Sequence, residues 1–191
     1  MIADQDRSGW FGASDTAMIM GNWKTKTFQK WWMQKLGVNN SRFSTRAMNA
    51  GTYYEHAILD TIGVLRKDHQ ILLPHLRLRV NLDGDAPFEI HEVKTHNADK
   101  VFKVTKAYWQ QVQVQGFAKL QEEHRVPVIK IHSYALEDAD YKNFFREIAL
   151  DRLKEHLVEY DPAFIGGLYL PRLLVLADCL EKGVMPREIP D

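Results

Sequence analysis

The chain has 191 residues and a mass of 22.2 kDa, with 45% hydrophobic and 26% charged residues. These proportions are typical of a soluble globular domain and exclude a disordered protein. The 25 basic and 25 acidic side chains cancel, which excludes a uniformly basic nucleic-acid coat. The polar N-terminus predicts no signal peptide, and apolar runs such as residues 173–177 are too short to cross a membrane. We therefore expect a single domain over residues 1–191, in the cytoplasm.

Local composition adds two constraints. The single cysteine, Cys179, permits no intrachain disulfide and no multi-cysteine metal site, and its apolar surroundings favour packing as a small hydrophobe. Residues 1–50 hold seven basic and three acidic side chains, whereas residues 151–191 hold five basic and eight acidic ones. This asymmetry favours contact between the N-terminal part and a polyanion.

The first part of the chain has the spacing and end signals of helices. Ser14 or Asp15 can cap a first helix, and glycines follow the first and second helices. Trp31 and Trp32 lie at core spacing in the second helix. The predicted helices cover residues 16–20, 27–36 and, starting at 44 or 45, up to about 62.

The period then changes to that of strands. Residues 76–83 alternate between apolar and polar, residues 84–87 resemble a turn, and residues 88–95 form a second strand, so we expect a hairpin. The remaining pattern predicts, in chain order, a helix over 105–120, a strand over 126–134, and helices over 140–160 and 171–181. The predicted fold is an α/β core with a small sheet flanked by helices.

The hairpin carries the first candidate site. Strand period places Glu92 and Lys94 on one face, and the hairpin brings Asp83 beside Glu92. Two carboxylates at a strand end can bind Mg²⁺ or Mn²⁺, and a lysine nearby can stabilise charge on a phosphate or orient a water molecule. Such residues also occur on ordinary solvated hairpins, so this pattern alone leaves both interpretations open. Asp85 is a turn residue here and a possible substitute ligand.

Two helices offer further polar groups. Gly51 and Glu55 share a face of the third helix, where glycine permits close approach and Glu55 is either another carboxylate of the metal site or solvent-exposed. The helix over 105–120 carries Tyr108 and Gln111 one turn apart. Its glutamines either hydrogen-bond an active-site group or form a solvated face.

The N-terminus offers a phosphate-binding pattern. Arg7 and Ser14 flank a glycine-containing turn that opens a helix, and helix N-termini with an arginine bind phosphate. An ordinary helix cap with a surface arginine is the alternative. Trp10 and Phe11 favour core packing, with stacking on an unpaired base as the other option.

Together, in this order, these motifs resemble the lambda-exonuclease-like (YqaJ-type) viral recombinase family of the PD-(D/E)XK nuclease superfamily. The resemblance spans about residues 7–118. The matching positions are Arg7, Gly12-Ala13-Ser14, Gly51 to Glu55, Asp83-Gly84, Glu92-Val93-Lys94, and Tyr108 with Gln111 and Gln113.

The resemblance implies a PD-(D/E)XK (restriction-endonuclease-like) core, a small mixed sheet flanked by helices with additional N- and C-terminal helices. It implies a Mg²⁺- or Mn²⁺-dependent deoxyribonuclease that uses one or two ions and digests linear duplex DNA from 5′ to 3′. The resulting 3′ tails would serve recombination with a single-strand annealing protein. It further implies a possible trimeric ring, no membrane association, and a bacterial or phage-infected host cytoplasm.

The resemblance also implies roles for individual residues. Asp83, Glu92, Glu55 and the Val93 carbonyl would bind metal, and Lys94 would position the attacking water. Gln111, Gln113 and Tyr108 would contact the site, while Arg7 and Ser14 would hold the 5′-phosphate of the DNA end.

Other interpretations stay open at this point. The same site could belong to a structure- or site-directed endonuclease, which would not need a free 5′ end. A non-catalytic DNA- or partner-binding module is the alternative of another class, and the intact set of Asp83, Glu92 and Lys94 argues against it. A zinc site from His91, Glu92 and His96 is disfavoured because His91 faces away from Glu92 on a strand.

Overall fold

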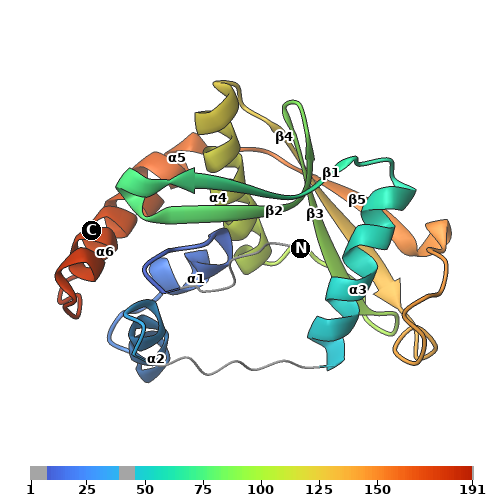
Figure 1. Cartoon of the computed structure of the whole chain (residues 1–191), viewed down its shortest axis with the longest axis horizontal. Coiled ribbons are helices and arrows are strands. Elements are labelled where there is room, and N and C mark those ends of the chain that lie inside the picture. Colours follow the sequence, from blue (N-terminus) through green and yellow to red (C-terminus); the bar gives the residue numbers. More distant parts are fainter. Residues whose placement is uncertain (1–7, 39–45, 191) are drawn as a thin grey trace.

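A mixed sheet forms the centre of the part that this computed structural model describes, residues 8–38 and 46–190 (Figure 1). β3 and β4 run parallel, and the other neighbouring pairs are antiparallel. The five strands lie in sheet order β1 (Arg66–Leu73), β2 (Leu78–Ala86), β3 (Glu89–Asn97), β4 (Val128–Leu136) and β5 (Leu153–Val158). This mixed sheet confirms the predicted α/β class.

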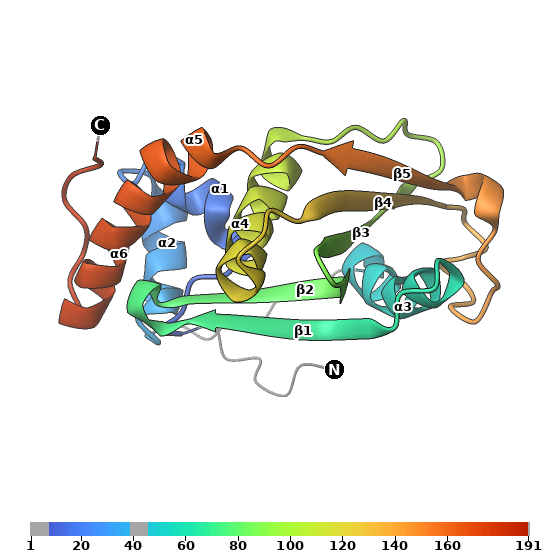
Figure 2. The same cartoon turned by 90° about the horizontal axis from the view of Figure 1, so that it is seen from above.

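Helices cover both faces of the sheet. α3 (Arg46–Thr61) packs on one face with Val93 of β3, and α4 (Lys106–Glu123), the crossover from β3 to β4, packs on the other with Ile90. Figure 2 shows α2 (Lys26–Lys35) and α6 (Leu170–Lys182) at one end of the strands and α3 toward the other end. The two faces therefore have separate hydrophobic clusters, and a site at the sheet can draw residues from α3 and from α4.

The N-terminal helices agree with the sequence prediction except at the first cap. α1 (Thr16–Ile19) follows a short 3-10 turn, η1 (Ala13–Asp15), and the Asp15 carboxylate accepts a hydrogen bond from the Gly12 N–H at 2.8 Å. No side-chain cap bond from Ser14 occurs there, and Ser14 is exposed. Trp32 of α2 is fully buried, as expected of a core residue.

The hairpin of β2 and β3 opens into a fork. The backbone pairing that starts beside the turn ends with Gly84 opposite His91. One residue further, the Asp83 carboxylate takes the place of a backbone acceptor, since its Oδ2 accepts the Val93 N–H at 2.8 Å. The two strands diverge at the positions of Asp83 and Glu92, so both carboxylates stand where the sheet opens.

The Asp-Gly step does not form the predicted turn. Gly84 and Asp85 lie inside β2, and the turn falls at Phe88, which has a φ of 60°. A Cβ at Gly84 would stand 2.7 Å from the Leu59 Cδ2 of α3, so glycine is required there for close packing of helix on sheet. Asp85 is buried and accepts a bond from Lys119 Nζ at 2.5 Å, which corrects its assignment as a turn residue and substitute ligand.

The first strand of the sheet was not predicted. β1 begins with a charged stretch, and its residues are mostly half-buried, so the sequence shows little apolar alternation there. The strand exists because its backbone pairs along the length of β2, from Arg66 opposite Asp85 to Leu73 opposite Leu78. Tertiary pairing therefore overrides a weak local pattern in this strand.

The long helix predicted over residues 140–160 is wrong. This stretch contains turns, a 3-10 turn (η3, Leu150–Arg152) and the edge strand β5. Asp140 is fully buried and accepts hydrogen bonds from Arg146 at 2.6 Å and from Arg152 at 2.5 Å. A helix would place Arg152 about 18 Å from Asp140 along its axis, so the two ion pairs require a folded-back loop.

Replacing Asp140 with asparagine is expected to lower the free energy of unfolding by about 2–4 kcal/mol, because two arginines lose a buried counter-charge. Urea unfolding measures the effect. Glu137→Gln is the matched control, since the exposed Glu137 faces the same two arginines at 3.4 and 3.6 Å. The control should change stability by no more than about 0.5 kcal/mol, and equal losses in both variants would contradict the assigned role of Asp140.

The C-terminal part forms one continuous helical segment. α5 (Pro162–Phe164), a π-helical turn (η4, Ile165–Tyr169) and α6 follow one another, and Gly183 ends α6 with a φ of 66°, as the sequence predicts. Pro162–Lys182 is long and apolar enough to cross a membrane by length and composition, unlike the shorter runs considered from sequence. Its buried side chains, including Leu173, pack in the cluster on the α4 face, and 33% of the apolar window is buried.

Candidate active site

A cavity of about 360 Å³ lies at the fork between β2 and β3. Its walls come from β1, β2, β3, α3, α4 and the segment around η1. Among the residues that line it are the predicted site residues Ser14, Glu55, Asp83, Glu92, Val93, Lys94 and Gln111. The structure therefore brings together, in one concave site, side chains separated by almost one hundred positions in the sequence.

Glu92 is held by donors on both carboxylate oxygens. Its Oε1 accepts from Lys94 Nζ at 2.5 Å and from Gln111 Nε2 at 2.6 Å, and its Oε2 accepts from Gln115 Nε2 at 2.6 Å. The residue is only 1% exposed. These charge-assisted bonds fix the carboxylate in one orientation.

Asp83 lies in an environment that resists its negative charge. Burial, followed by the nearby carboxylates of Glu92 and Glu55, raises the pKa of Asp83 well above its usual value, while Lys94 and the bond from the Val93 N–H oppose this shift. A buried carboxyl group beside other carboxylates is a candidate ligand for a cation, because a cation would stabilise its ionised form.

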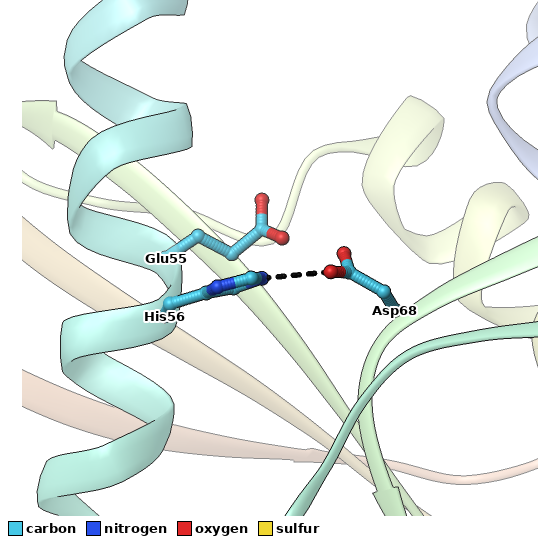
Figure 3. Close-up of side chains that lie close together, drawn as sticks. All are labelled: Glu55, His56 and Asp68. Atoms are coloured by element: carbon cyan, nitrogen blue, oxygen red, sulfur yellow. Dashed lines mark ion pairs between the residues drawn. The ribbon is translucent and has the colours of Figure 1, made fainter. Parts of the chain in front are cut away.

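Glu55 reaches the same cavity from α3. A Cβ on Gly51, one turn earlier, would make ordinary van der Waals contact with Thr95 Oγ1 at 3.4 Å, so the packing of α3 on β3 does not require glycine there. Burial and then the charge of Glu92 raise the pKa of Glu55 to about 7. Figure 3 shows Glu55 and His56 projecting from α3 toward Asp68 of β1, and His56 Nε2 lies 3.1 Å from Asp68 Oδ2.

Asp68 is a cavity residue that the sequence did not reveal. Potential ligand atoms of Glu55, His56 and Asp68 lie within 4.8 Å of one another. Asp68 has a φ of 54°, a left-handed conformation that is uncommon for residues other than glycine. No sequence pattern indicates Asp68 as a site residue, because the charged start of β1 shows little strand alternation.

Lys94 is the cation nearest the carboxylates. Burial lowers its pKa, but the charges of Glu92 and Asp83 outweigh burial and raise the pKa of Lys94 above its usual value. Its Nζ also lies 5.1 Å from the centre of the Tyr108 ring, which places Tyr108 beside the site. Lys94 is therefore protonated and directed into the cavity.

Of the two glutamines in the resembled motif, one reaches the site. Gln111 contacts both Lys94 and Glu92. Gln113 is fully buried on a different side of α4, where it donates to the Glu159 carbonyl and accepts from the Asp161 N–H, each at 2.7 Å. The prediction that Gln113 contacts the site is therefore wrong, because helix periodicity turns its side chain toward the C-terminal segment.

The opposite end of the cavity is formed around η1. Ser14 lines it together with Arg79 of β2 and Lys35 of α2, two buried basic residues that sequence reasoning missed. Lys35 Nζ donates to Asp15 Oδ2 at 2.5 Å. Arg7 lies outside the described residues, so its predicted phosphate contact stays a prediction. Phe11 is fully buried against Trp31 and Trp32, as core packing predicts. Both Trp10 and Phe11 line the cavity.

The donor chemistry of the cavity fits a small divalent cation. Carboxylates from α3, β1, β2 and β3 line one space with Lys94 beside them. Burial first, and then the neighbouring carboxylate charges, raise the pKa values of Asp83 and Glu55. Oxygen ligands of this kind suit Mg²⁺ or Mn²⁺ rather than softer metals. Asp83, Glu92 and Glu55 would hold such an ion, and the Val93 carbonyl stays a predicted ligand.

A second group of potential ligands lies between β1, β2 and the C-terminal end of α4. Atoms of His69, Asp85 and Glu122 are within 4.8 Å of one another. Lys119, which is fully buried, and Arg66 contact Asp85 directly. Their positive charges already neutralise this group, so the cavity at the fork is the better cation site.

The mixed five-stranded sheet, with a crossover helix between its parallel strands and carboxylates where two strands diverge, is an α/β core. Two solved structures share this fold. An alkaline exonuclease (LHK-Exo) from Laribacter hongkongensis aligns with 93% of this chain and 90% of its own, with a TM-score of 0.67 and 20% identity. A phage related exonuclease from Haemophilus somnus 129PT aligns with 91% of this chain and 94% of its own, with a TM-score of 0.63 and 12% identity.

These two matches confirm the predicted fold class. They also agree, at the level of the fold, with the resemblance of the sequence motifs to lambda-exonuclease-like proteins. No protein-family model matches the sequence, and no curated protein matches it. Activity must be argued from the site itself, because one fold supports many functions.

Proposed function

We propose that this protein is a Mg²⁺- or Mn²⁺-dependent deoxyribonuclease that digests linear double-stranded DNA from its 5′ ends and leaves 3′ single-stranded tails. The observation that carries the proposal is the convergence of Asp83, Glu92 and Glu55 with Lys94 in one cavity at the fork of the sheet. Hydrolysis of a phosphodiester needs a metal that activates water and stabilises charge on the phosphoryl oxygens, and these residues are suited to hold one.

Each residue has a role in this mechanism. Asp83, Glu92 and Glu55 provide the anionic oxygens for one or two ions. Gln111 and Lys94 fix Glu92, and the Lys94 ammonium also lies where it can orient water or neutralise charge that develops on the phosphate. Tyr108 packs beside the ammonium.

The exonuclease assignment is supported by the shared fold and by the basic end of the cavity. Ser14, Arg79 and Lys35 line this end of the cavity and carry hydrogen-bond donors that suit a 5′-phosphate. Arg7 is proposed to add a second guanidinium. The resemblance further suggests a single-strand annealing protein as partner, a trimeric ring around DNA, and action in the cytoplasm of a bacterial or phage-infected cell.

The direct test is a time course of digestion with Mg²⁺. Linear duplex DNA with 5′-phosphate ends, linear duplex with 5′-hydroxyl ends, and closed circular duplex are the substrates. We expect loss of the linear DNA, faster with the phosphate, an intact circle, and no reaction in EDTA until Mg²⁺ is restored. Labels on the 5′ and 3′ ends separately report the direction of digestion.

The other outcomes identify the alternatives. Cutting of the circle would replace the exonuclease with a structure- or site-directed endonuclease on the same core. A mobility shift without cutting of any substrate would point to a non-catalytic DNA-binding module.

The predicted phosphate contact can be tested with Arg7→Ala and Ser14→Ala. Each loses a donor to the terminal phosphate, so the rate on 5′-phosphorylated ends should fall about 10-fold or more, with a smaller change on 5′-hydroxyl ends. Single-turnover digestion of the two substrates measures the ratio. An equal loss on both ends would remove the phosphate-binding role.

A further inference from the structure

Gln115 is a buried amide with one unused polar atom. It lies on α4, one turn after Gln111, and is fully buried. Within the described part of the chain its Oε1 has no hydrogen-bond partner. An unsatisfied buried acceptor costs about 1–3 kcal/mol, so an apolar side chain of the same size would be cheaper at this position unless the amide serves a purpose.

The other end of the amide explains why it is retained. Gln115 Nε2 donates to Glu92 Oε2 at 2.6 Å. An ionised carboxylate only accepts hydrogen bonds, so the Nε2 must face Glu92 and the Oε1 must face away. The Nε2 also donates to the Asn81 carbonyl at 3.4 Å, so Glu92 and this carbonyl together impose the orientation that leaves Oε1 without a partner.

The Glu92 carboxylate is held at both of its oxygens. Its Oε1 accepts from Lys94 and Gln111, which line the cavity, whereas its Oε2 accepts from Gln115, which is fully buried. Lys94 and Gln111 therefore hold the carboxylate on its cavity side, and Gln115 holds it on its buried side.

We propose that Gln115 is a positioning residue that orients the Glu92 carboxylate for binding a divalent cation in the cavity. This inference rests on the proposed metal-dependent function and adds a residue that lies outside the resembled motif, whose last position is Gln113. Groups that orient metal ligands in this way commonly change metal affinity or activity about 10- to 100-fold when they are replaced.

The test compares Gln115→Met with Gln113→Met in the full chain. Both substitutions replace a fully buried glutamine of α4 with an apolar side chain of similar length, but Gln113 bonds Glu159 and Asp161 instead of Glu92. The readout is Mn²⁺ binding in the absence of DNA, measured by titration calorimetry and by the electron paramagnetic resonance signal of free Mn²⁺. Urea unfolding shows that each variant is folded.

We expect Gln115→Met to weaken Mn²⁺ binding about 10-fold or more, and Gln113→Met to bind Mn²⁺ as wild type does while losing stability. Gln115→Asn, which keeps an amide but is too short to reach Glu92, should weaken binding as the methionine variant does. Wild-type affinity in both folded Gln115 variants would overturn the positioning role alone. Absence of Mn²⁺ binding by the wild type would overturn the proposed function, and this inference with it.

Discussion

Replacing Asp83 with asparagine is expected to lower the rate of DNA hydrolysis at least about 10³-fold while leaving the metal-free protein as stable as wild type or more stable. The variant keeps an oxygen that can accept the Val93 N–H and removes the charge that a cation needs. Burial and the charges of Glu92 and Glu55 raise the pKa of Asp83, so its ionised form opposes folding when no metal is present.

The same pKa shift sets the pH dependence of stability. For a carboxyl whose pKa is raised by folding, stability is full below the unfolded pKa of about 4 and falls as pH rises through the folded pKa. Metal-free wild type should lose stability over this range, and Asp83→Asn should lose less. Urea unfolding against pH measures both slopes, and initial rates on linear duplex DNA measure activity. Near-normal hydrolysis by the variant would remove Asp83 from the site.

Much of the fold could be predicted because its local signals agree with its tertiary contacts. The hairpin of β2 and β3 follows from strand alternation, and the crossover helix α4 has a capping residue, Thr105, whose side chain accepts the Tyr108 N–H. The predictions failed where long-range pairs decide the structure. The loop after β4 is shaped by Asp140 and its two arginines, which a helical pattern cannot reveal.

In the site, too, the residues set by local pattern could be predicted, and those set by long-range contacts could not. Asp83, Glu92 and Lys94 come from adjacent strands, so period and pairing bring them together without further information. Glu55 and Gln111 depend on how two helices pack on opposite faces, and the motif order suggested them. Asp68 could not be predicted as a site residue, because the strand that carries it has no clear sequence pattern. Arg79 and Lys35 could not be predicted either, because nothing in the sequence distinguishes them from surface cations, although both are buried and line the cavity.

Lys94 separates metal binding from catalysis. Asp83 and Glu92 would supply negative charge to the cation, whereas Lys94 supplies positive charge in the same cavity and competes for Glu92. Loss of the ammonium removes a competitor for the carboxylates and leaves their oxygens in place. The charge that develops on a phosphate during hydrolysis, however, loses a fixed cation nearby.

The Lys94→Met variant is therefore expected to bind Mn²⁺ as tightly as wild type or more tightly, yet to hydrolyse DNA about 10²- to 10³-fold more slowly at saturating metal. Lys94→Arg should restore little of the rate, because a planar guanidinium cannot replace a compact ammonium between Glu92, Gln111 and the Tyr108 ring. Titration calorimetry gives the affinity and single-turnover digestion gives the rate. If weaker Mn²⁺ binding fully accounts for the slower rate, Lys94 only organises the ligands. If the rate stays low at saturating Mn²⁺, Lys94 acts in the chemical step. Asp83→Asn should differ from Lys94→Met, because it should lose both metal binding and rate.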